Sequence, residues 1–196
     1  MWKQLGTAFR LVVVMTVLTG LFYPGLVTGL CQWLFPARAN GSLIQVNGRV
    51  VGSTLIGQDF MKAEYFHPRP SAAGNGYDAS NSGGSNYGPT NQNLVNRVKA
   101  SIAKFREDNP QFQGPIPADL VTASASGLDP DISLASAEAQ AARVAAARDV
   151  PVEQVHRLIE GHTEKRELGF LGDPRVNVLE INVALDHQFP RPWAIF

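Results

Sequence analysis

Cysteine is almost missing from this chain of 196 residues. The single one, Cys31, lies inside a long apolar segment near the N-terminus. One cysteine can form neither an intramolecular disulfide nor a cysteine-based metal site. Any folded domain in the chain must therefore be held together by packing and hydrogen bonds.

The sequence also lacks an excess of charge of either sign. It has 17 basic and 17 acidic residues, so the formal net charge is zero. Proteins that bind DNA or RNA usually carry a basic surface that attracts phosphate groups. We therefore expect no nucleic-acid partner.

Familiar catalytic motifs are missing as well. The sequence contains no G-x-x-x-x-G-K-[ST] loop, no Asp-Lys-Thr-Gly-Thr phosphorylation loop and no G-x-S-x-G nucleophile elbow. The four histidines, His67, His156, His162 and His187, do not have the spacing of a metal site. We expect no catalytic residue and no metal site. An exported enzyme is therefore a weak hypothesis for the function of this chain.

A long apolar run is present. Residues 11–35 contain no Asp, Glu, Lys, Arg or His, and a helix of this length spans a hydrocarbon layer of roughly 30 Å. Lys3 and Arg10 precede the run and only Arg38 follows closely, which favours a cytoplasmic N-terminus. We predict a cytoplasmic segment over residues 1–10, a transmembrane helix over 11–35 and an exported soluble domain over 36–196.

The alternative for this run is a cleaved signal peptide. Ala37-Arg38-Ala39 has the small-x-small form of a cleavage site, but signal peptides have apolar cores of only about 7 to 15 residues. The length of the run therefore favours a retained anchor. Within it, Gly20, Pro24, Gly25 and Gly29 suit close packing against a partner helix, although such residues are also simply common in membrane helices.

The soluble part predicts a single α+β domain with a β-hairpin and about three to four helices. Asn47-Gly48 favours a tight turn between strands at 43–46 and 49–51. Residues 68–89 are rich in Gly, Ser, Asn and Pro and predict a long loop. Helices are expected after a cap at Thr90 up to Pro110, over 133–149, and from Pro151 to Gly161.

Two segments are ambiguous. Residues 119–122 are compatible with a short strand. Residues 176–185 alternate as in a strand, yet Asp173-Pro174 before them resembles a helix start, and we favour a helix. Asp129 and Asp131 flank Pro130 and could act as paired acids, but such residues more often form turns and caps.

The loop at residues 80–86, with the sequence SNSGGSN, has recognition chemistry. Its glycines allow close approach, and its hydroxyl and amide groups can bind an anion, a cation or a backbone. As a nucleotide site it lacks a nearby lysine and a strand-to-helix frame. We favour a structural or interface loop over a nucleotide site.

Several blocks of the sequence resemble one family. The chain resembles the KdpC family, the C subunits of the bacterial high-affinity potassium-transporting ATPase, or Kdp complex. The blocks are 23–29 (YPGLVTG), 39–43 (ANGSL), 52–58 (GSTLIGQ), 65–72 (YFHPRPSA), 82–86 (SGGSN), 117–130 (PADLVTASASGLDP), 143–148 (RVAAAR) and 169–179 (GFLGDPRVNVL). The C-terminal stretch 189–196 has no place in the family pattern.

The resemblance implies an accessory, non-catalytic subunit in the bacterial inner membrane. Its partners would be a channel-like A subunit that selects potassium, a P-type B subunit that hydrolyses ATP, a small F subunit and membrane lipid. ATP and K⁺ would be handled by the complex, with this chain assembling or stabilising it and modulating potassium access or ATP affinity. The alternative is a nucleotide-binding regulatory subunit that uses the loop from Ser82 to Asn86.

Motif membership and chemistry select the candidate interface or loop residues. They are Arg69, Ser82, Gly83, Gly84, Ser85, Asn86, Asn91, Ser126, Asp129, Arg143 and Arg148. For the last two, internal pairing with Asp129 or Asp131 is an equally good expectation.

Overall fold

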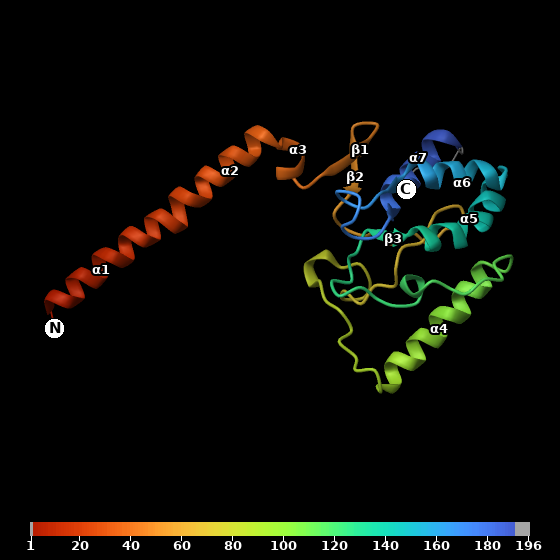
Figure 1. The fold of residues 1–196 in the computed structure, drawn as a ribbon, viewed down its shortest axis with the longest axis horizontal. Coiled ribbons are helices and arrows are strands. Elements are labelled where there is room, and N and C mark those ends of the chain that lie inside the picture. Colours follow the sequence, from red (N-terminus) through yellow and green to blue (C-terminus); the bar gives the residue numbers. More distant parts are fainter. Residues whose placement is uncertain (1, 191–196) are drawn as a thin grey trace. The chain divides into compact units, whose positions relative to one another are not determined.

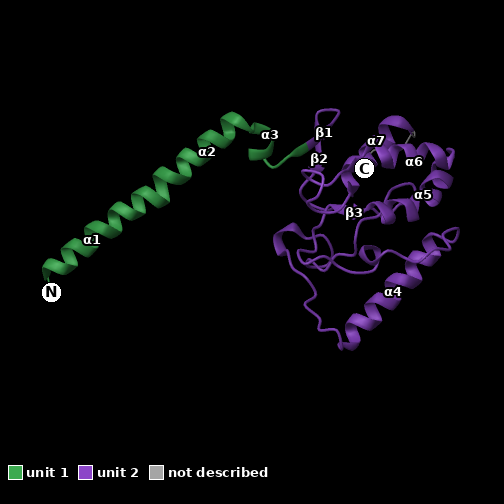
Figure 2. Ribbon diagram, in the orientation of Figure 1, with its two compact units in different colours: residues 1–43 green, residues 44–196 purple. Residues whose placement is uncertain are grey.

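The computed structural model describes residues 2–190, so residues 191–196 of the C-terminal stretch lie outside the described part. The chain divides into two compact units, residues 1–43 and 44–196 (Figure 2).

The first unit is almost entirely helical. Helix α1 (Trp2–Thr16) continues through the π-helical turn η1 (Val17–Phe22) into α2 (Tyr23–Leu34), and the short α3 (Pro36–Ala39) follows. The continuous run from Trp2 to Leu34 is long and apolar enough to cross a membrane, judged by its length and composition. Residues 11–34 of the predicted span lie in this helix, which begins earlier, at Trp2, and ends one residue before the predicted boundary.

Pro24 explains the π-helical turn. A proline has no backbone N–H, and in a regular helix its ring clashes with the carbonyl four residues earlier, here that of Gly20. The helix avoids this clash by widening locally, and the N–H of Tyr23 donates to the carbonyl of Leu18, five residues back. The helix therefore accommodates Pro24 through a π-bulge.

The second unit begins with the predicted hairpin. Strands β1 (Leu43–Val46) and β2 (Arg49–Ser53) form a two-stranded sheet. Asn47 and Gly48 both have positive φ, at 53° and 77°, as the type I′ turn requires. The prediction is confirmed, with β2 extending two residues further than expected.

A three-stranded antiparallel sheet and three helices form the main core. The strands β3 (Asp131–Ser133), β5 (Arg175–Asn177) and β4 (Thr163–Glu164) lie in that order, and Val176 of the central strand pairs with both Ile132 and Thr163. Helix α5 (Leu134–Arg148) packs on α6 (Val152–Gly161), and α6 packs on α7 (Val178–Gln188). Figure 1 shows these helices grouped together. The largest fully buried apolar residues are Phe66, Ile132, Val144, Val155, Ile159, Val176, Val178, Leu179, Ile181 and Leu185.

The fourth long helix, α4 (Gln92–Asp108), stands apart from that group (Figure 1). Its N-cap is Asn91, whose side chain accepts from the N–H of Asn93 at 2.8 Å, so the cap predicted at Thr90 is wrong by one residue. Phe105 is its buried residue and packs with Leu120 in a second, smaller cluster. The helix therefore packs mainly through its C-terminal end.

Two ambiguous segments are resolved. The possible strand at 119–122 is not formed, because a 3₁₀ turn, η3 (Ala118–Leu120), follows the two prolines at 115 and 117. Residues 176–185 are mostly helical, as favoured, but the helix starts at Val178 with Asn177 as its cap, and not at Asp173-Pro174. Residues 68–89 are irregular apart from the short η2 (Ala79–Asn81), which confirms the loop. The α+β class with a hairpin is confirmed.

Candidate interface and the pocket beside it

The predicted recognition loop packs against a second loop of the same unit. The N–H of Gly83 donates to the carbonyl oxygen of Ser126 at 2.8 Å, and the hydroxyl of Ser82 donates to the same oxygen at 3.0 Å. A Cβ added to Gly84 would lie 2.8 Å from the carbonyl oxygen of Ala125. The glycines therefore serve close contact between two backbones.

A third segment, residues 71–77, is bound to the second of these loops through Ser71. Its hydroxyl donates to the carbonyl oxygen of Gly127 at 2.6 Å and accepts from the N–H of Tyr77 at 2.8 Å. Gly127 has φ of 68°, and a Cβ there would lie 2.6 Å from the backbone nitrogen of Ala73. Residues 71–77, 82–84 and 125–127 thus form one loop layer, held by hydrogen bonds between turns.

Arg69 and Asp129 fix the edge of this loop layer. The Arg69 Nη1 lies 2.6 Å from the Asp129 Oδ2, and both side chains are about a quarter exposed. The other carboxylate oxygen of Asp129 accepts from the N–H of Asp131 at 3.1 Å. Asp129 is therefore a turn and ion-pair residue, and the notion of an acid pair with Asp131 is not supported, since Asp131 pairs with Arg175 at 3.1 Å. Burial raises the pKa of Asp131, and Arg175 opposes that rise.

Arg143 is buried and lies on the inner face of α5. Its Nε donates to Asn109 Oδ1 at 3.0 Å, its Nη1 to the carbonyl of Tyr65 at 3.0 Å, and its Nη2 to Gln140 Oε1 at 2.7 Å. Nη1 also donates to the carbonyl of Ala63. Burial lowers the pKa of Arg143 to about 10, which leaves the guanidinium charged at neutral pH.

Arg148 lies one further turn along α5 and forms an ion pair. Its Nη2 lies 2.7 Å from Asp186 Oδ1, and its guanidinium stacks 4.9 Å from the centre of the Tyr65 ring. The Tyr65 hydroxyl donates to the other oxygen of Asp186 at 2.8 Å. Burial, and then that hydrogen bond, raise the pKa of Tyr65 to about 12. The expected pairing of Arg143 or Arg148 with Asp129 or Asp131 is therefore wrong, because those acids pair with Arg69 and Arg175 instead.

Both arginines belong to a set of helix side chains that bind segment 63–67, which begins in a turn and belongs to no strand. Gln140 of α5 accepts from the N–H of His67 at 2.8 Å and donates to its carbonyl at 3.1 Å. Asn182 of α7 likewise accepts from the N–H of Phe66 at 2.8 Å and donates to the carbonyl of Phe66 at 3.0 Å. Side-chain amides thus replace the neighbouring strand that this segment lacks. Nothing in the spacing of the sequence signalled these long-range contacts.

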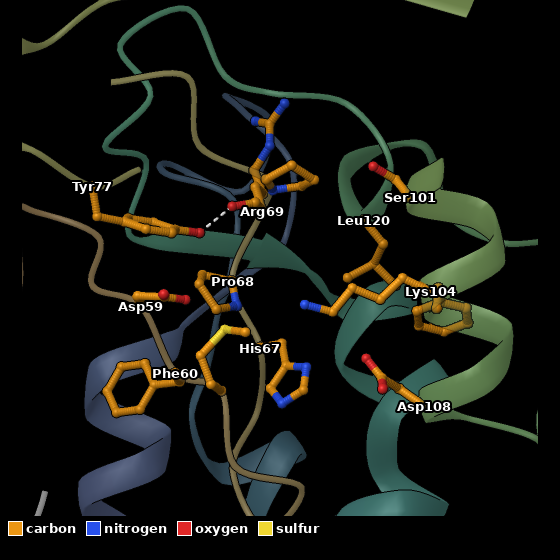
Figure 3. A pocket seen from close by; sticks show the side chains of 13 residues that line it. Asp59, Phe60, His67, Pro68, Arg69, Tyr77, Ser101, Lys104, Asp108 and Leu120 are labelled. Atoms are coloured by element: carbon orange, nitrogen blue, oxygen red, sulfur yellow. Dashed lines mark hydrogen bonds between the residues drawn. The ribbon is translucent and has the colours of Figure 1, made fainter. Parts of the chain in front are cut away.

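A pocket of about 200 Å³ opens between this segment and α4 (Figure 3). Lys104 extends into it from α4, with Asp108 from the same helix and Asp59 across from them (Figure 3). His67 lines it too, and burial followed by the nearby Arg143 lowers the His67 pKa to about 4. The pocket thus combines charged side chains with apolar ones such as Phe60 and Leu120, and its histidine is neutral at neutral pH. Among residues 2–190 no group of three or more His, Cys, Asp or Glu side chains could hold a metal ion.

The structure distributes the predicted residues over two layers. The loop layer and its edge contain Arg69, Ser82, Gly83, Gly84, Ser126 and Asp129. Ser82, Asn86, Asn91 and Ser126 are exposed, whereas Arg143 and Arg148 are buried under segment 63–67. In the first unit, Gly25 and Gly29 have no atom within 4 Å of an added Cβ, so their side of the helix is open.

Sequence reasoning missed one exposed apolar feature, at residues 167–172. Leu168, Phe170 and Leu171 are 83%, 70% and 49% exposed. The signal available in the sequence was three apolar residues enclosed by charged residues and by Gly169 and Gly172.

Comparison with known proteins gives consistent results. The model of the family described as "KdpC: K+-transporting ATPase, c chain" matches residues 5–187. A protein of Koribacter versatilis named "Potassium-transporting ATPase KdpC subunit" is 55% identical over 193 residues, which is 98% of each chain. Proteins with the same name from Rhodospirillum rubrum and Myxococcus xanthus are 57% identical over 190 residues and 56% identical over 196 residues. They cover 97% and 99% of this chain, and 98% and 93% of their own lengths.

Proposed function

This chain belongs to the KdpC family of potassium-transporting ATPase subunits, and we propose that it anchors in the membrane and assembles or stabilises its complex. It is a subunit and not a catalytic protein by itself. The observation that carries the proposal is the match over nearly the whole chain, together with an N-terminal helix long and apolar enough to cross a membrane.

The proposed topology has one transmembrane helix, residues 11–35, with residues 1–10 in the cytoplasm and residues 36–196 in the periplasm of an inner membrane. The cationic side chains of Lys3 and Arg10 before the apolar run support this orientation. Gly25 and Gly29 are one turn apart and have open space beside them, which suits close packing of a partner helix. We assign that partner to the channel-like A subunit, with the B and F subunits completing the complex.

The second unit supplies the proposed external contact surface. Four exposed polar residues can bind a partner backbone: Ser82 and Ser126 lie in the loop layer, Asn86 follows it in the chain, and Asn91 caps α4. Five residues shape that layer: Arg69, Gly83, Gly84, Ser85 and Asp129. The buried Arg143 and Arg148 support it through their contacts with segment 63–67. In this position the unit would influence potassium access to the complex.

The alternative is a nucleotide-binding regulator that uses residues 82–86 to change ATP affinity. The exposed hydroxyls of Ser82 and Ser126 favour it, but the N–H of Gly83 is occupied by Ser126 and therefore cannot bind phosphate. This function also needs the loop on the cytoplasmic side. Labelling an introduced Ser85→Cys, in a chain where Cys31 is replaced by Ala, separates the two proposals. Modification from the external side alone removes the nucleotide site.

The assembly role is tested by removing residues 40–196 while keeping the helix. We expect the truncated chain to insert but to lose stable association and potassium-stimulated ATPase activity of the complex. Full assembly and full activity with the helix alone would contradict the role of the second unit.

A further inference from the structure

The exposed apolar turn between β4 and β5, defined here as the tip (residues 167–172), has a rigid hairpin geometry. The N–H of Glu167 donates to the carbonyl of Leu171, and the N–H of Leu171 donates back to that of Glu167, both at 2.9 Å. At its base, Arg166 pairs with Asp173 at 3.1 Å. The tip is therefore a hydrogen-bonded turn with a defined shape.

The conformation of Leu168 is unusual for its residue type. Its φ is 51°, in the left-handed region that glycine and asparagine tolerate and that leucine rarely adopts. Its side chain is also 83% exposed, so no contact within the described residues compensates for the strained backbone by burying it. Strain of this kind persists where the surroundings or a function require it.

The tip presents an apolar surface on a rim of balanced charge. Residues 163–175 contain three basic and three acidic side chains, and two of the three cations, Arg166 and Arg175, are already paired with acids. A tip that inserted into an anionic lipid surface would need free cations around its apolar end. The paired rim instead fits an uncharged, apolar pocket on another protein.

The size of the tip also limits the identity of its partner. Three side chains cannot supply the roughly 1,200 Å² or more that a stable interface between two free proteins buries. So small a contact can form stably only if another part of the chain already holds the two proteins together. A second copy of this chain is therefore a poor candidate, and a subunit already bound through the membrane helix is a good one.

We propose that the tip, through Leu168, Phe170 and Leu171, docks into an apolar pocket on the external face of another subunit of the potassium-transporting complex. This inference rests on the proposed function, since it requires a partner held by the membrane helix. The chain has an apolar side chain at the end of the hairpin in spite of the strain at Leu168. In the proposed contact, this side chain enters the pocket first.

The test uses the full chain in the assembled complex, with Leu168→Asn as the main variant. Asparagine accepts a positive φ, so the purified chain should keep or gain thermal stability. The apolar contact is lost, so the fraction of the chain retained with the other subunits in detergent should fall about tenfold. Met61→Asn changes another exposed apolar residue, 63% exposed against 83% for Leu168 and without a positive φ, and is the control, expected to retain normal association.

A photoreactive phenylalanine analogue at position 170 identifies what the tip contacts. Cross-linking in membranes to another subunit of the complex supports the proposal. Cross-linking only to lipid or to a second copy of this chain, no cross-link at all, or unchanged retention of Leu168→Asn overturns it. If the wild-type chain itself failed to co-purify with the other subunits, the proposed function would be wrong, which is a separate result.

Discussion

The ion pair between Arg148 and Asp186 should be among the most sensitive points of the second unit. The Arg148 side chain is fully buried and that of Asp186 is 14% exposed, with 2.7 Å between them. Asp186→Ala would leave a buried guanidinium with only the carbonyls of Glu64 and Phe189 as acceptors, and the Tyr65 hydroxyl without its acceptor. Removing one partner of a buried pair costs about 3–5 kcal/mol.

Thermal unfolding of the full chain in detergent, followed by circular dichroism, measures this loss. A change of 1 kcal/mol shifts the melting temperature of a domain of this size by roughly 2–4 °C, so we expect a drop of about 10 °C. The matched control is Asp173→Ala, which breaks an ion pair whose side chains are 51% and 90% exposed and should cost less than about 1 kcal/mol.

A double variant separates the pair from its surroundings. Arg148→Met with Asp186→Leu removes both charges and keeps apolar volume, so the double variant should be more stable than Asp186→Ala. Equal melting temperatures for Asp186→Ala and the exposed control would refute the reasoning, because burial would then have no effect on the stability lost when an ion pair is broken.

Three further predictions concern other parts of the second unit. In the folded chain the pKa of His67 is lowered to about 4, whereas the pKa of an unfolded histidine is near 6.5. The contribution of the neutral His67 to stability is therefore complete above about pH 6.5 and is lost as the pH falls towards 4. His67→Gln should flatten the pH dependence of the unfolding free energy in that window, by on the order of 2–3 kcal/mol, and an unchanged slope would contradict it. Gly127→Ala should destabilise by at least about 2 kcal/mol in denaturant titration, since its φ is positive and the new Cβ would meet the Ala73 nitrogen at 2.6 Å. Asn177→Ala should cost about 2 kcal/mol or more, because it removes both the α7 cap and the donor to the Thr54 carbonyl, whereas Asn91→Ala at the exposed α4 cap should cost about 1 kcal/mol.

Local signals in the sequence predicted the elements whose cause is local. Asn47-Gly48 can form its turn without help from distant residues, and the side chain of Ser133 begins α5 by accepting from the N–H of Ser136. The α4 cap was misplaced by one residue because Thr90 and Asn91 are both good caps. Only the packing of the preceding loop decides which of them adopts the cap conformation.

Long-range pairing could not be predicted in the same way. Arg148 and Asp186 are 38 residues apart, and Arg69 and Asp129 are 60 apart. Sequence spacing says nothing about which of several acids an arginine meets once the chain folds. The tip was missed for a related reason, since an apolar turn residue is usually assumed to be buried and only the fold shows that Leu168 is not.

Segment 63–67 links the buried arginines to the candidate interface. Its backbone groups bind side chains of α5 and α7, including Gln140, Arg143, Arg148 and Asn182, in place of a neighbouring strand. The same segment leads directly into Arg69 and the loop layer. Loss of Arg143 would therefore displace the loops without any contact of its own with a partner. Substitutions of Arg143 or Arg148 that weaken assembly should also lower the melting temperature. Substitutions of the exposed Ser82 or Ser126 that weaken assembly should leave the melting temperature unchanged. This difference distinguishes residues that support the loops from residues that contact the partner.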